Sequence, residues 1–255
     1  MSNEFLTNWF RSEPKEYPYG TKMFSAIKQL ILFFMGWIGF RIISTIIQVV
    51  LVALVKSNSL PTDFIDSYAL IMTINTTSYL TLLMILLLVS NVDLAKLAKS
   101  FTKIQSFLAG VACLIAIFGF DYLYSIFVYL LRTPVTNNIN ETTLVSLETL
   151  YPAGALIIFG FIGPICEELT YRVGLFSFFR RKSRKLAYIV TMIVFAFIHF
   201  NFSTTSLLNE ILNLPFYAFA AFAFSYAYER FGFAASLTAH ILNNVISIAF
   251  IKIIH

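Results

Sequence analysis

Long apolar runs dominate this sequence and limit what the chain can fold into. About 20 apolar residues in a helix are enough to cross the hydrocarbon core of a bilayer. Within the bilayer each backbone polar group must be satisfied internally, which favours helices. We therefore expect an all-α, polytopic transmembrane helix bundle with seven spans, or eight if the long first run is divided. The runs cover about residues 24–55, 68–89, 107–130, 152–178, 186–200, 207–228 and 233–253.

The composition agrees with a membrane protein. Hydrophobic residues make up 58% of the chain and charged residues only 12%, against about 25% charged in soluble domains. Both cysteines, Cys113 and Cys166, lie in apolar runs, so we interpret them as small core residues and not as a disulfide. The net charge of +5 does not indicate nucleic-acid binding, because the basic residues gather in short loops between the runs.

Those loops predict the orientation of the chain. With the N-terminus in the cytoplasm, segments 1–28, 91–106, 179–185 and 229–232 are cytoplasmic and hold 13 lysines and arginines. The opposite side holds three. Cytoplasmic loops of membrane proteins carry such an excess. We expect a multi-pass protein of the cell membrane. The Ile, Asn, Lys and Phe content suggests an AT-rich bacterial genome, so the expected location is a bacterial plasma membrane.

The chain divides into three parts. Residues 1–22 are polar and form an expected cytoplasmic tail. Residues 23–150 are expected to be accessory transmembrane helices, because the longest internal polar stretch, 131–150, closes this part. Residues 151–255 hold all three histidines and an adjacent carboxylate pair. We therefore place the active site in the C-terminal helices.

The carboxylate pair is Glu167-Glu168, followed by Arg172 inside the fourth run. A charge at the bilayer centre costs at least about 2.5–3.5 kcal/mol on insertion scales, so such residues usually face the protein interior and carry function. Glu168 and Arg172 are four apart and can pair on one helix face. Glu167 points about 100° away and is left for chemistry. Pro164 can bend the helix just before the pair.

Two further pairs at the same spacing complete the set: Phe195 with His199, and His240 with Asn244. Estimates from helix rise put Glu167, His199 and His240 at compatible depths, about 10 to 20 Å from the cytoplasmic ends of their spans. One carboxylate and two imidazoles are a common ligand set for a catalytic zinc that keeps a position open for water. We therefore predict that Glu167, His199 and His240 bind a divalent metal ion, which we expect to be zinc.

Without a metal, Glu167 can act as general base on a water. In either version Asn244 can donate a hydrogen bond to the developing oxyanion. The same residues also suit other roles. A Glu–Arg pair can simply lock two helices together, and a proton-coupled transporter also uses buried carboxylates and histidines.

Two more charged residues lie inside apolar runs. Arg41 can pair with a buried carboxylate, or its side chain can reach the membrane interface. Asp121 can serve as a proton relay, pair with Arg41, or lie near the interface.

The C-terminal half resembles the CPBP family of intramembrane proteases, which comprises CAAX proteases and bacteriocin-processing enzymes and is also called the Abi family. This family includes the type II CAAX prenyl endopeptidases. Its pattern is E-E-x-x-x-R, F-x-x-x-H and H-x-x-x-N or -D. This chain has Glu167-Glu168-x-x-x-Arg172, Phe195-x-x-x-His199 and His240-x-x-x-Asn244 in that order, within about residues 150–250. Each motif alone is weak, but three in order within apolar runs are specific.

The resemblance implies that residues 151–255 are a CPBP-like catalytic core of an intramembrane endopeptidase. It implies that Glu167 activates the water with His199, that His240 and Asn244 stabilise the oxyanion or help hold a metal, and that Glu168 and Arg172 support them. The expected substrate is a peptide or small membrane protein in the lipid bilayer. The alternative is a non-proteolytic scaffold, such as a regulatory or immunity partner of a sensor protein.

Overall fold

The structure is a computed structural model that describes residues 24–90, 93–132, 136, 139–202 and 206–254. Every regular element within those residues is helical, and they contain no strand. The predicted all-α class is therefore confirmed. The expected N-terminal tail, residues 1–22, lies outside the described residues.

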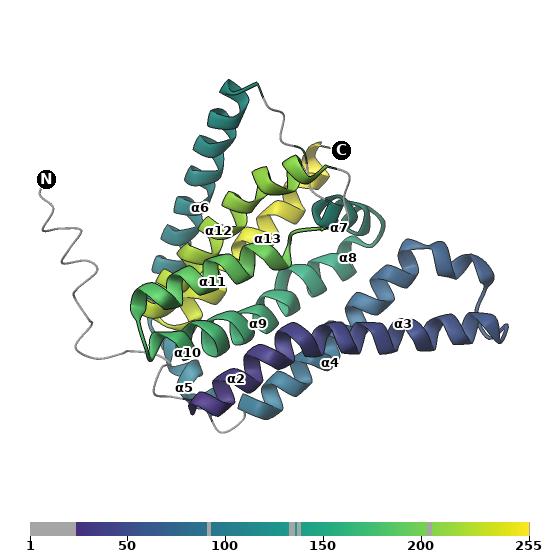
Figure 1. Ribbon diagram of the computed structural model, residues 1–255, viewed down its shortest axis with the longest axis horizontal. Helices are drawn as coiled ribbons and strands as arrows, with labels where there is room; N and C mark the ends of the chain where they lie inside the picture. Colours follow the sequence, from purple (N-terminus) through teal and green to yellow (C-terminus); the bar gives the residue numbers. More distant parts are fainter. Residues whose placement is uncertain (1–23, 91–92, 133–135, 137–138, 203–205, 255) are drawn as a thin grey trace, which may run out of the picture.

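Two long antiparallel helices form the first part of the chain (Figure 1). The outgoing rod consists of α2 (Ala26–Phe34), the π-helical turn η1 (Met35–Gly39) and α3 (Phe40–Lys56). It is one uninterrupted helical stretch of 31 residues, so the first apolar run is not divided. After a short 3₁₀ turn, η2 (Thr62–Asp66), the chain returns through α4 (Tyr68–Ser90).

Among the described residues, five helices are long and apolar enough to cross a membrane: Ala26–Lys56, Tyr68–Ser90, Ile104–Leu130, Pro152–Arg180 and Leu207–Phe231. The other two expected spans are shorter. Helix α11 (Arg184–Ile198) has only 15 residues, and α13 (Phe233–Ile254), with 22 residues, counts as a shorter apolar helix over Phe233–Ala249. The chain is thus a membrane protein with several apolar spans, while the count of seven stays a prediction.

The span Pro152–Arg180 is the axis of the bundle. In its most apolar window 56% of the residues are buried, against 11–28% in the other four spans. Figure 1 shows it running between the α2–α4 pair on one side and α11, α12 (Leu207–Phe231) and α13 on the other. The motif carried by this span is therefore enclosed on both sides by protein.

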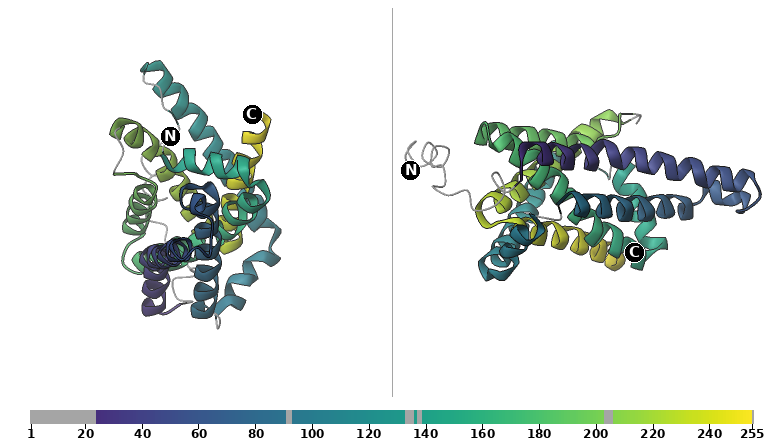
Figure 2. Two further views of the ribbon diagram at one scale, coloured as in Figure 1. Left: turned by 90° about the vertical axis from the view of Figure 1, so that its right-hand side faces the viewer. Right: turned by 90° about the horizontal axis from the view of Figure 1, so that it is seen from below.

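The remaining helices lie at the edges. Short helices α5 (Leu94–Ala98) and η4 (Lys99–Thr102) lead into α6 (Ile104–Leu130), which packs on α12 and α13 and is steeply inclined to the other helices (Figures 1 and 2). The polar stretch 131–150 contains a helix that the sequence did not predict, α7 (Ile139–Leu150). Its buried Leu147 packs with residues of α4, the central span and α13.

The basic cluster at 180–185 has a structural role beyond the predicted one in orientation. Glu229 on α12 accepts hydrogen bonds from Arg180 on α10 (Ser177–Arg180) at 2.6 Å and from Arg184 at 2.9 Å. The Tyr188 hydroxyl also donates to Glu229, at 2.8 Å. All four side chains are buried. This cluster fixes the end of α12 to the turn between α10 and α11.

Glycines allow the N-terminal helix to approach the central span closely. A Cβ added at Gly36 would lie 1.8 Å from the Thr170 hydroxyl, and one at Gly174 would lie 2.9 Å from the Phe33 nitrogen. Neither approach is possible with a larger residue unless the backbone shifts. The accessory helices are thus in direct contact with the segment that carries the motif.

Candidate functional site

The motif lies in a helix whose winding is unusually wide. The central span contains two π-helical segments, η5 (Leu156–Ile162) and η6 (Glu168–Phe176), which flank α9 (Gly163–Glu167). Such π-helical turns are rare in proteins, and those that occur often lie at functional sites. Glu167 ends α9 and Glu168 begins η6, so the carboxylate pair stands where the winding changes.

Asn244 compensates for the proline in this helix. In π-helical winding the carbonyl of Phe159 would accept from the amide of residue 164, and Pro164 has no N–H. Asn244 Nδ2 on α13 instead donates to that carbonyl at 2.9 Å. The amide group has a second N–H, which is left for a ligand. The role of Asn244 in holding an oxyanion stays a prediction, and its contact with the helix backbone was not predicted.

Glu168 is the best-compensated charge in the site. Its side chain is fully buried, and Arg172 Nη1 lies 3.3 Å from Oε1. His240 Nδ1 donates to Oε1 at 2.8 Å, and Ser236 Oγ donates to Oε2. The predicted pairing of Glu168 with Arg172 is confirmed. Ser236 was missed, although it precedes His240 by four residues and so shares its helix face.

Arg172 is also held by aromatic rings. Its guanidinium carbon lies 4.8 Å from the ring centroid of Phe195 and 5.1 Å from that of Phe224. Aromatic faces attract cations at such distances. Phe195 was predicted to share a helix face with His199, and the structure shows that its ring also covers Arg172.

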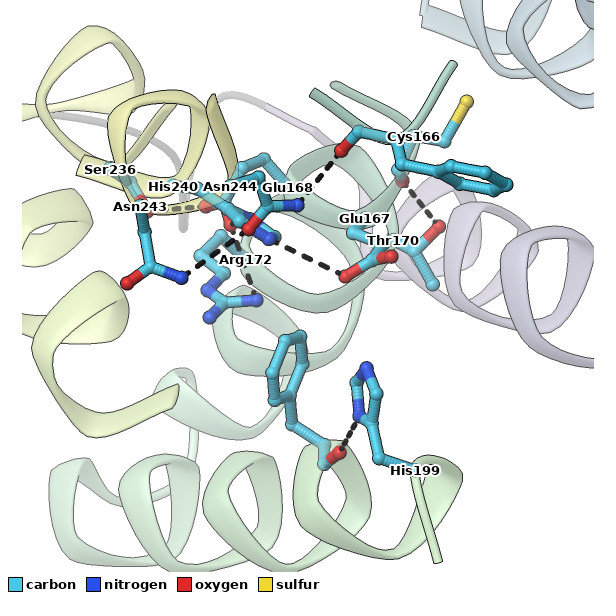
Figure 3. A network of polar contacts seen from close by, with 12 residues as sticks. Cys166, Glu167, Glu168, Thr170, Arg172, His199, Ser236, His240, Asn243 and Asn244 are labelled. Carbon is cyan, nitrogen blue, oxygen red and sulfur yellow. Dashed lines mark hydrogen bonds and ion pairs between the residues drawn. The ribbon is translucent and has the colours of Figure 1, made fainter. Parts of the chain in front are cut away.

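Glu167 faces the histidines, as the helix geometry predicts. Its side chain is 20% exposed, and Oε2 lies 3.7 Å from His240 Nε2. In the tautomer whose Nδ1–H is donated to Glu168, His240 Nε2 is an acceptor, like the Glu167 carboxylate. Two acceptors at this separation favour a shared donor, for which a water molecule is suited. Figure 3 shows the two side chains next to each other, with the His199 ring directed toward them from α11.

His199 is held rigidly at the end of α11. Nδ1 donates to the carbonyl of Phe195 at 2.8 Å. The imidazole stacks on the Tyr217 ring, with centroids 4.3 Å apart and planes 11° apart. The Tyr217 hydroxyl donates to Glu141 Oε1 at 2.9 Å. Neither Tyr217 nor Glu141 was predicted, because no local spacing links α7 and α12 to a histidine on α11.

These groups line one cavity of about 460 Å³. Glu167, His199, His240 and Asn244 all contribute to it, so the four predicted catalytic side chains share one space. Its walls also come from helices outside the motifs: Trp37, Arg41, Asn75, Tyr79, Glu141 and Glu148. Asp121 lines a different groove, and no ion pair joins it to Arg41. The suggested Arg41–Asp121 pair is therefore not formed.

Helix α7 brings a second carboxyl group to this cavity besides Glu141. The side chain of Glu148 is buried, and burial raises the pKa of its carboxyl to about 7. At neutral pH a large share of this group is therefore protonated and can donate as well as accept a hydrogen bond.

The donor types in the cavity suit a metal ion, but their spacing does not. Both histidines commit Nδ1–H to a protein oxygen and keep Nε2 as an acceptor, which is the usual arrangement of a metal-binding histidine. Yet within the described part of the chain no group of three or more His, Cys, Asp or Glu side chains could hold a metal ion. The set Glu167, His199 and His240 stays a prediction as a metal site.

Comparison with protein families gives a match in the C-terminal part of the chain. Residues 149–246 match the family described as type II CAAX prenyl endopeptidase Rce1-like. The match spans all three motifs and confirms the family resemblance, and it leaves the first 148 residues uncovered. No curated protein and no solved structure matched the chain.

The contact between Asn244 and the helix backbone predicts an energetic coupling with Pro164. Asn244→Ala should lower the free energy of unfolding by about 1 kcal/mol, because it removes the donor to the Phe159 carbonyl. In a Pro164→Ala background the backbone amide returns and the loss should shrink by about half or more. Unfolding of all four proteins of this cycle in detergent measures the coupling. Equal losses in both backgrounds would show that Asn244 does not replace the proline amide.

Proposed function

From the match of residues 149–246 to the Rce1-like type II CAAX prenyl endopeptidases, we propose that the protein is an intramembrane endopeptidase. It hydrolyses a peptide bond in a membrane-associated peptide or small membrane protein. The observation that carries this proposal is the division between the two carboxylates. Glu168 is bound by Arg172, Ser236 and His240, while Glu167 faces the cavity.

In the proposed mechanism a water molecule binds between Glu167 and His240 Nε2. Glu167 accepts a proton from the water as its oxygen attacks the peptide carbonyl, and this group thereby acts as general base. The negative oxygen of the tetrahedral intermediate accepts a hydrogen bond from the second N–H of Asn244. One such donor contributes about 10²–10³ in kcat in well-studied proteases. The proton on Glu167 then passes to the departing amine as the C–N bond breaks.

His199 and His240 prepare this water site in different ways. His240 is oriented by Glu168 through Nδ1, at 2.8 Å, so its Nε2 is fixed toward Glu167. His199 is fixed by the Phe195 carbonyl and the Tyr217 ring. The barrier falls when reacting groups are held in place before the substrate arrives, because less orientational entropy is lost in the transition state.

We further propose that this site binds a divalent metal ion, with zinc as the preferred candidate. Glu167, His199 and His240 would hold it after their side chains turn toward one another. A bound zinc would lower the pKa of a coordinated water to near neutrality. The Nε2 atoms of His199 and His240, which are left as acceptors, support this proposal. Because the side chains are too far apart to hold a metal as they stand, they would have to move on binding.

We also propose that the protein resides in a bacterial plasma membrane with its N-terminus in the cytoplasm. The 13 basic residues on one side against three on the other support this orientation. The substrate is then a bacterial peptide precursor, signalling peptide or small membrane protein.

His199→Ala and His240→Ala should each lower cleavage by at least about 100-fold, because each variant removes a group that orients the attacking water. Cleavage is measured on the full chain in liposomes with a panel of fluorescence-quenched, lipid-anchored peptides of mixed sequence. Gln48→Ala, at an exposed position of α3, is the control and should keep full activity. If both histidine variants cleave at the wild-type rate, the protease proposal is wrong and the scaffold function gains support.

Metal content tests the cofactor separately. Full-length protein purified without chelators should contain about one zinc per chain, and a His199→Ala/His240→Ala double variant should contain none. Elemental analysis by mass spectrometry measures both. A wild-type protein that cleaves peptides after chelation and holds no metal would leave Glu167 as the activator of the water and would overturn the zinc proposal.

A further inference from the structure

A second groove, of about 800 Å³, lies beside the cavity of the motifs. Residues of α6 and α12 form most of it, and five side chains line both spaces. These shared residues are Glu141, Tyr217, Ala220, Asn243 and Ser247. The groove and the catalytic cavity are therefore separated by a single layer of side chains, which includes the tyrosine that stacks on His199.

Asp121 gives the groove an uncompensated acidic group. It lies within α6, a helix long and apolar enough to span the membrane. Its Oδ1 atom is buried and has no hydrogen-bond partner, and Asp121 forms no ion pair within the described residues. Glu141, which also lines the groove, adds a second carboxylate. An intramembrane carboxylate without a partner is costly and marks a place where a cation or a proton belongs.

Apart from Asp121 and Glu141, the groove is lined by apolar and aromatic side chains together with five uncharged polar ones: Ser125, Thr136, Asn213, Asn243 and Ser247. Its walls include Ile117, Phe118, Ile126, Phe216 and Ala220. A ligand that satisfies both parts must join a positive charge to a hydrocarbon stem. Lysine and arginine side chains have this construction, since their methylene groups cover apolar surface while the charged end reaches a polar partner.

We propose that this groove binds a basic side chain, lysine or arginine, of the peptide substrate, with Asp121 as its ion-pair partner. The inference rests on the proposed function, because the substrate is taken to be a peptide held in the adjacent cavity. The shared wall places the basic residue next to the segment in which the peptide bond is cleaved. Asp121 is then a specificity-determining residue and takes no part in the chemistry.

Binding tests this proposal without cleavage. The protein is full-length Glu167→Gln in lipid nanodiscs, which holds the peptide without turning it over. The probe is a dansyl-labelled dodecapeptide of alternating leucine and alanine with one central lysine, and its twin carries norleucine in place of that lysine. Both have the same hydrocarbon stem at the varied position. Binding is measured by dansyl fluorescence, with empty nanodiscs subtracted to remove partition into the lipid.

The lysine peptide should bind about tenfold or more tightly than its twin, and Asp121→Asn should reduce this difference to less than about twofold. Asp63→Asn removes an exposed carboxylate outside the spans and should leave the difference unchanged. Equal binding of both peptides would overturn the proposal, and the groove would then hold a lipid chain or a protonated Asp121. A preference for lysine that survives Asp121→Asn would also overturn it, because Asp121 would not be the ion-pair partner. The assay measures binding to an inactive variant. A wild-type protein that lacks protease activity would therefore contradict the proposed function without producing either of these two binding results.

Discussion

The buried ion pair between Glu168 and Arg172 is the interaction on which the site depends. Both side chains are fully buried, and each would be very costly alone at this depth. The structure satisfies the carboxylate with Ser236 and His240 and covers the guanidinium with two phenyl rings. As a consequence α13, which carries Ser236 and His240, is fixed against the central span. The contact that neutralises Glu168 also sets the tautomer and direction of His240 and leaves Glu167 to face the cavity.

The family match covers only residues 149–246, yet the cavity is completed by residues before it. Arg41 and Trp37 come from the first rod, Asn75 from α4 and Glu141 from α7. The close packing at Gly36 explains how the first rod reaches the motif helix. The N-terminal part thus forms one wall of this cavity.

Sequence reasoning succeeded where the chemistry is local. Residues four apart on one helix share a face, so the pairing of Glu168 with Arg172 and the separate direction of Glu167 followed from spacing. The long apolar runs likewise predicted helices. Spacing could have added Ser236, one turn before His240. It could not have found Tyr217 or Glu141, because their contact with His199 depends on how three helices pack. Nor could it predict α7, since a polar stretch with three asparagines and no clear apolar period resembles a loop.

The two adjacent glutamates have separate functions in the proposed mechanism, one structural and one chemical. Turnover and unfolding free energy measured together on Glu167→Gln and Glu168→Gln test this division most directly. Glu168→Gln should lose about 3–5 kcal/mol of stability, because it leaves Arg172 without its charge partner. Glu167→Gln should keep nearly all its stability and lose cleavage by at least about 100-fold. If the two variants lose stability and activity to the same extent, the division of function between the glutamates is wrong.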